Sequence, residues 1–161
     1  NNIGKKLTWL ISGVITLVAL MSFYIYEIRN LNELLFLVAF IGFGSGAGGI
    51  LFWSMLPDTI EYGEVKTGVR SESSLYGFMT FAQKGSIAFA IIILGIVLDL
   101  IGFKANEIQT TNTIDDMKSI MTLIPAFGVG LSLIIIYFYP IDAKKHKELL
   151  QKIQRRTNEA N

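Results

Sequence analysis

Long apolar blocks alternate with short polar segments along the chain. Four blocks, at residues 7–26, 34–56, 75–101 and 119–139, are almost free of charge. Each has about 20 residues or more, which is enough to cross a bilayer as one helix. None carries the polar stripe that a helix of a soluble bundle would need. The pattern therefore predicts an all-α membrane protein, with four transmembrane helices in residues 1–139. Residues 140–161, which follow the break at Pro140, are expected to form a basic helical tail.

Composition supports this class and argues against catalysis. Hydrophobic residues make up 52% of the chain and charged residues only 17%, and there is no cysteine. Disulfides and thiolate metal sites are therefore excluded. The one histidine, His146, lies in the charged tail, where we expect a solvated surface residue. No Ser/His arrangement or metal-ligand cluster is visible, so we expect no enzyme, no resident cofactor and no metal.

The positive charges predict an orientation. Ten lysines and arginines fall on one side of the predicted spans and three on the other, with Lys84 inside a span. Because basic residues are enriched on the cytoplasmic side, both termini and the segment 57–73 are expected there. The first residue is Asn and no secretory leader precedes the first block, so we expect a fragment of a longer chain. The two basic sets are Lys5, Lys6, Lys66, Arg70, Lys144, Lys145, Lys147, Lys152, Arg155 and Arg156, against Arg29, Lys104 and Lys118.

The second block contains a run of glycines, Gly42-Phe-Gly-Ser-Gly-Ala-Gly-Gly49. It satisfies a dinucleotide-binding string, but that motif requires a strand–helix–strand unit, and none is predicted here. Glycines one turn apart let a neighbouring helix approach closely, which is our first interpretation. The alternative is a helix that bends or unwinds beside a substrate path.

Charged residues crowd into the segment between the second and third blocks. On a helix, Asp58 and Glu61 would share a face, and Pro57 would kink the helix end or let the chain leave the membrane. The pair could serve as acid and base, bind a cation or proton, or form salt bridges; a solvated loop is the plain alternative. The alternating signs favour a charge network that can be made and broken, with the members Asp58, Glu61, Glu64, Lys66 and Arg70.

Lys84 is the most informative single residue because it lies within the third apolar block. If a helix starts near Ser74, ten residues at about 1.5 Å each place the lysine about 15 Å into the bilayer. A charge at that depth costs a few kcal/mol and normally faces a partner or a wet cavity. Tyr76 and Thr80 share its helix face and could help it to bind a polar ligand such as a sugar. A structural ion pair is the alternative.

These residues resemble a known family. The stretch Asp58-Thr-Ile-Glu-Tyr-Gly-Glu-Val-Lys-Thr-Gly-Val-Arg-Ser-Glu72, followed by Phe81-Ala-Gln-Lys84-Gly-Ser-Ile-Ala, is similar to the signature of the glycoside–pentoside–hexuronide:cation symporters. These are relatives of melibiose permease in the major facilitator superfamily. Lys5-Lys6 and the tail Phe138-Tyr-Pro-Ile-Asp-Ala-Lys-Lys145 also match, and the motif forms are most similar to bacterial glucuronide carriers.

The resemblance implies helices nine to twelve of a twelve-helix transporter. It places the family's sugar-cavity lysine at Lys84, with a neighbouring polar position at Thr80. It places the acidic pair of the inner gate at Asp58 and Glu61, together with an arginine at Arg70. A tryptophan of the melibiose permease sugar site has no clear match, since Gly49 falls at its place.

The resemblance also implies a function for the intact protein. The expected function is symport of a glycoside or hexuronide with Na⁺ or H⁺ across the bacterial cytoplasmic membrane. The coupling cation would be bound mainly by missing N-terminal helices. The expected partners are thus the sugar, the cation, the lipid bilayer and those helices, with no nucleic acid. The alternative is a small four-span membrane scaffold without a transport cycle. A scaffold would need neither a mid-membrane lysine nor a gate-like charge cluster.

Overall fold

The computed structural model describes residues 4–141 and 143–160, so Asp142 of the tail motif lies outside the described residues. Five helices follow one another, with no strand in the described part: α1 (Lys5–Ile25), α2 (Leu31–Thr67), α3 (Glu72–Leu100), α4 (Thr111–Tyr137) and α5 (Ala143–Ala160). The first four are long and apolar enough to cross a membrane. The all-helical prediction is therefore confirmed, while the limits of the bilayer along each helix stay a prediction.

Local signals explain where the helices begin and end. The Asn30 side chain accepts from the backbone N–H of Glu33 and donates to its carboxylate, which satisfies a free donor at the start of α2. Thr110 caps α4 in the same way, accepting from Thr113. Gly68 ends α2 with φ of 76°, a left-handed conformation that glycine adopts without a steric cost. Only residues 68–71 separate α2 from α3.

The helix α2 is longer than the second apolar block. The charged segment after Leu56 was expected to be a connection, but it stays helical through Pro57 to Thr67. A proline removes one backbone donor and need not stop a helix if nearby groups are held in place. Here the Lys5 ammonium donates to the carbonyl of Ser54, three residues before Pro57. A helix of 37 residues is about 55 Å long, so its charged end extends beyond a hydrocarbon layer of about 30 Å.

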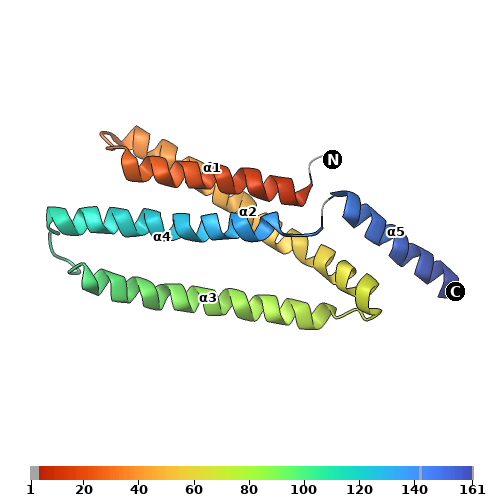
Figure 1. Cartoon of the computed structure of the whole chain (residues 1–161). Coiled ribbons are helices and arrows are strands. Elements are labelled where there is room, and N and C mark those ends of the chain that lie inside the picture. The colour runs from red at the N-terminus through yellow and green to blue at the C-terminus, as the bar shows by residue number, and fades with distance from the viewer. Residues whose placement is uncertain (1–3, 142, 161) are drawn as a thin grey trace.

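The helix α1 is the centre of the packing (Figure 1). It contacts both α2 and α4 along its length, while α5 contacts the end of α2. Gly44 of α2 lies directly on Thr16 of α1, and a side-chain carbon added there would stand 3.0 Å from the carbonyl oxygen of Ser12. Gly44 therefore confirms close packing for one glycine of the run. Gly42, Gly46, Gly48 and Gly49 have open space around them within the described part.

The helix α3 is different because no residue of it is buried. It meets α2 mainly near their short connection and otherwise runs apart from α1 (Figure 1). The buried apolar residues all come from the other four helices and the segment between α4 and α5: Ala19, Leu20, Met55, Leu56, Ile60, Ala126, Ile136, Ile141 and Leu149.

Two adjacent lysines join the start of α1 to its neighbours. Lys6 donates to the carbonyl oxygens of Tyr137 and Tyr139, at 2.7 and 2.9 Å, and thereby satisfies acceptors left free at the end of α4. Lys5 reaches α2 instead. One end of the bundle thus brings together the beginning of α1, the charged end of α2 and the end of α4.

Candidate functional site

A buried ion pair forms the centre of the charged end of the bundle. The Lys5 Nζ donates to Oδ1 of Asp58 at 2.7 Å and to the carbonyl oxygen of Ser54 at 2.6 Å. Only 6% of the Asp58 side chain is exposed. A carboxylate this deeply buried needs a cation and hydrogen bonds to offset its desolvation, and Lys5 supplies both.

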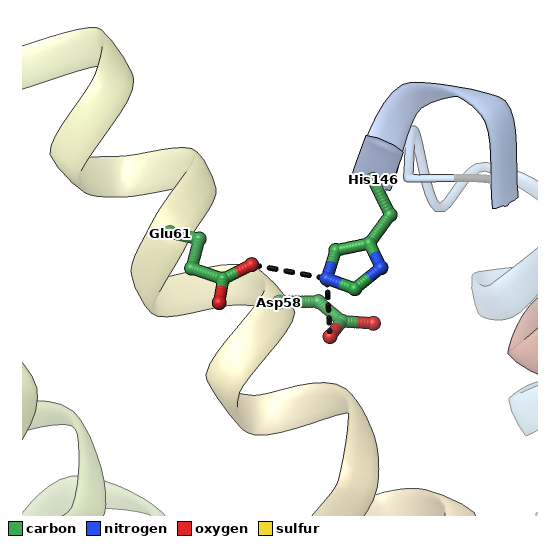
Figure 2. Close-up of side chains that lie close together, drawn as sticks. All are labelled: Asp58, Glu61 and His146. Atoms are coloured by element: carbon green, nitrogen blue, oxygen red, sulfur yellow. Dashed lines mark hydrogen bonds and ion pairs between the residues drawn. The ribbon is translucent and has the colours of Figure 1, made fainter. Parts of the chain in front are cut away.

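His146 of α5 completes this cluster (Figure 2). Its Nε2 lies 3.0 Å from a carboxylate oxygen of Glu61 and 3.4 Å from Oδ1 of Asp58. The two acids stand one turn apart on α2, which turns both toward the imidazole, as the i, i+3 spacing predicts. The His146 side chain is 29% exposed, so the cluster borders on solvent. The expectation that His146 is a solvated tail residue is therefore wrong, because α5 lies against α2.

The other predicted gate residues form a separate group. Arg70 donates to Glu64 at 2.9 Å and to Glu72 at 3.1 Å, which ties the end of α2 to the start of α3. The hydrogen bond to Glu64, followed by that to Glu72, raises the pKa of Arg70. Lys66 is exposed and makes no ion pair with another described residue. The five predicted network members thus divide into the Asp58–Glu61 pair and the Glu64–Arg70 pair, with Lys66 apart from both.

Tyr76, Thr80 and Lys84 lie on one face of α3, at four-residue spacing. The Thr80 hydroxyl donates to the carbonyl of Tyr76 at 2.8 Å. Lys84 is exposed, and within the described residues it has no hydrogen-bond or ion-pair partner. The structure therefore brings the three predicted ligand residues onto one face, but the described residues supply no opposite wall.

The cavity beside α3 lies on a different face of that helix. It has a volume of about 520 Å³ and is lined almost entirely by apolar atoms of α1, α2, α3 and α4. Leu75, Phe78 and Met79 contribute from α3, and at about 100° per residue they point away from the face of Lys84. This cavity therefore does not include the predicted sugar-binding residues.

Comparison with known proteins identifies the family. The model of the MFS/sugar transport protein family matches residues 1–143 of the chain. The chain belongs to this family. It is 34% identical over 154 residues to the glucuronide carrier protein homolog of Escherichia coli K12, covering 96% of this chain and 34% of that protein. The names of these relatives describe transporters. With four helices long and apolar enough to cross a membrane, this chain is an integral membrane protein.

Two further relatives in the family show similar coverage. The chain is 32% identical to the putative sulfoquinovose importer of Escherichia coli K12, over 96% of this chain and 33% of the relative. It is 31% identical to the uncharacterized symporter YnaJ of Bacillus subtilis strain 168, over 96% of this chain and 33% of that relative. The chain spans about a third of the length of these curated relatives.

Two residues of the site could not be chosen from the sequence. Lys5 was singled out only as one of the basic residues that predict the orientation and as part of the Lys5-Lys6 match, and its partner lies 53 positions away. His146 is 85 positions from Glu61. The one available signal was the break at Pro140, after which the tail must change direction and is free to fold back on the bundle.

Proposed function

We propose that this chain is part of a secondary active transporter that couples a glycoside or hexuronide sugar to Na⁺ or H⁺ across the bacterial inner membrane. The observation that carries the proposal is Lys84, an exposed cation in the interior of a long apolar helix. In a membrane such a residue must face a partner or a wet cavity. Among the relatives, a glucuronide carrier homolog and a putative sulfoquinovose importer support a sugar as the substrate.

The four long helices would be helices nine to twelve of a twelve-helix fold. The chain covers about a third of its relatives' length, which agrees with four helices of twelve. In this arrangement α5 and the charged end of α2 lie in the cytoplasm, with both termini on that side. The ten-to-three asymmetry of lysine and arginine supports the same orientation.

The substrate site would lie on the open face of α3. Lys84 would donate to sugar hydroxyls or pair with a hexuronide carboxylate, while Thr80 and Tyr76 add a hydroxyl and an aromatic surface. The opposite wall would come from the N-terminal helices of the same transporter. Those helices would also hold most ligands of the coupling cation, since the exposed face of α3 offers no acid near Lys84.

The inner gate would be built from the charged end of α2. Asp58 and Glu61, held by Lys5 and His146, would form one part, and Glu64, Lys66 and Arg70 the other. Ion pairs at the meeting point of several helices suit alternating access, because they can break as the two halves rock and reform afterwards. Arg70 lies in the four-residue connection and pairs with Glu64 of α2 and Glu72 of α3. It would therefore hold the two helices together where they bend relative to each other.

Counterflow tests the proposal. Vesicles containing the full-length protein are loaded with one unlabelled sugar from a panel of glycosides and hexuronides, and entry of the labelled sugar is followed with and without a Na⁺ or H⁺ gradient. We expect accelerated exchange for at least one sugar and gradient-driven uptake of the same sugar. No exchange for any member of the panel would contradict the assignment.

Orientation has its own test. Single cysteines at Thr67 and Lys147 should react only with reagents that reach the cytoplasm, and one at Asn112 only with reagents outside the cell. Labelling of the Thr67 position in intact cells by an impermeant reagent would reverse the orientation.

A further inference from the structure

The charged cluster at the end of α2 holds two acids and one imidazole beside a single ammonium group. Asp58 and Glu61 carry two negative charges, and among the described residues Lys5 is the one ammonium or guanidinium within 4 Å of either. The third group is the imidazole of His146, which lies within 4 Å of both acids. Two carboxylates and one imidazole, the side chains that commonly bind a divalent transition metal, are therefore gathered at one point.

The positions of the three donor atoms suit a small metal ion. Nε2 of His146 lies 3.0 Å from Oε2 of Glu61 and 3.4 Å from Oδ1 of Asp58, and all three atoms lie within 4.8 Å of one another (Figure 2). Metal–ligand bonds of about 2.0–2.2 Å in a tetrahedral site separate the ligand atoms by about 3.3–3.6 Å. Small side-chain rotations would bring the three atoms to that spacing.

The ligand types select the class of metal. One imidazole nitrogen with two carboxylates suits zinc and its neighbours among the divalent transition metals, whereas Ca²⁺ and Mg²⁺ prefer oxygen ligands alone. The donors come from two separate helices, so the group is not merely a run of acids on one surface. Three protein ligands leave a fourth position for water, and the partial exposure of Glu61 and His146 provides access.

Lys5 binds the same oxygen of Asp58, Oδ1, that lies 3.4 Å from Nε2 of His146. It donates to Asp58 and to the carbonyl of Ser54. Ligating carboxylates are commonly hydrogen-bonded by an outer partner that orients them, and Lys5 is placed to do this for Asp58.

We propose that Asp58, Glu61 and His146 bind one divalent transition-metal ion of the zinc class, and that the bound ion fastens α5 to the end of α2. The proposal does not depend on the transported substrate. The two helices already touch here, and Leu149 of α5 is buried. A metal would convert this contact between a tail and a membrane helix into a coordinated crosslink.

The binding test uses the purified full-length protein, freed of metal with a chelator and titrated with Zn²⁺ by calorimetry at pH 7.5. We expect that His146→Gln weakens binding to one site by about tenfold or more, and that Glu61→Gln, which keeps the side-chain size, does the same. Lys147→Gln is the matched control, because it removes a charge from the adjacent position of α5 without touching the cluster. It should change the affinity by less than about twofold.

A second measurement follows α5 itself. In the wild-type protein, Zn²⁺ should slow tryptic cleavage within α5 severalfold, and His146→Gln should abolish this protection. Binding to His146→Gln with wild-type affinity would overturn the proposal. So would a result in which Zn²⁺ leaves the cleavage of α5 unchanged in the wild-type protein.

Discussion

The helices α1 and α3 have similar hydrophobicity but opposite surroundings. α1 buries Ser12, Thr16, Ala19 and Leu20 against its neighbours, while α3 buries no residue. In lipid, apolar surface alone gives helices little reason to associate, so close contact depends on small residues and hydrogen bonds. α1 makes such a contact where Thr16 packs directly against Gly44 of α2. The glycines of α3, by contrast, have open space around them within the described part.

If the chain is part of a larger transporter, as proposed, we expect the open face of α3 to meet its other helices. One face of α1 is packed inside this chain, whereas α3 presents Lys84, which has no partner among the described residues. Mutations in α1 and its contacts should therefore affect stability first. Mutations on the open face of α3 should affect transport first, and this contrast can be tested in the full-length protein.

Replacing Lys84 should give the largest effect. We expect Lys84→Leu to lower sugar uptake by about 30-fold or more, since loss of a buried charge interaction costs about 2–5 kcal/mol. Thermal stability should be unchanged or higher, because a costly charge is removed from the membrane. Lys84→Arg should insert and fold but bind sugar poorly, since its donors are differently placed. Wild-type uptake by the Leu variant would remove Lys84 from the site, and a large loss of stability would make it a structural partner.

A pair of glycine substitutions tests the packed side. Gly44→Ala should destabilise the protein by about 1–3 kcal/mol relative to Gly48→Ala, because the new methyl group meets Thr16 and the backbone carbonyl of Ser12. The two changes have the same helix propensity, so the difference isolates packing. Thermal unfolding in detergent provides the measurement. Equal melting temperatures would show that α1 and α2 do not approach as closely as described.

Asp58 tests whether the charged end of α2 works as a gate. Asp58→Asn keeps the side-chain shape but weakens the pairing with Lys5. We expect the translocation rate to fall about tenfold, equivalent to about 1.4 kcal/mol on the barrier, with little change in sugar binding at equilibrium. Uptake rate and membrane binding are compared on the same preparation. A variant that loses binding and rate equally would place Asp58 in the substrate site instead.

The smallest effect is expected at Arg70. Its two ion pairs are exposed, and exposed pairs contribute little because water and salt screen them. Arg70→Gln should leave the melting temperature unchanged within error. A slower uptake with this unchanged stability would mean that the pairs matter to motion rather than to folding. A clear drop in melting temperature would contradict the structural assignment.

Helices were predictable because length and hydropathy decide them locally. All four membrane-length helices appear where the apolar blocks lie, and the tail is helical as expected. The continuation of α2 through Pro57 was not predictable from a polar stretch, because a proline commonly kinks or ends a helix. Likewise, α4 begins eight residues before its expected start, at Thr111 against 119, because the Thr110 cap and not hydropathy sets the start of the helix.

The site residues also divide into those that local helix geometry places and those that contacts between helices place. Tyr76, Thr80 and Lys84 share a face because four-residue spacing on one helix requires it. The pairing of Asp58 with Lys5, and of Glu61 with His146, joins residues far apart in the chain. Such contacts depend on how α1 and α5 lie against α2, which no local pattern reports. The roles proposed for these residues in transport stay predictions.

The two lysines at the beginning of α1 have a mechanical consequence. Neighbouring side chains on a helix diverge by about 100°, so Lys5 and Lys6 reach different partners. Lys5 binds Asp58 of α2, and Lys6 binds backbone carbonyls at the end of α4. Sliding α1 along α2 would pull Lys5 off Asp58, and sliding it along α4 would pull Lys6 off two carbonyls. These contacts therefore hold α1, α2 and α4 together at this end of the bundle. While these contacts hold, a rearrangement at this end of the bundle would carry the three helices as a block and place the bending in residues 68–71, before α3.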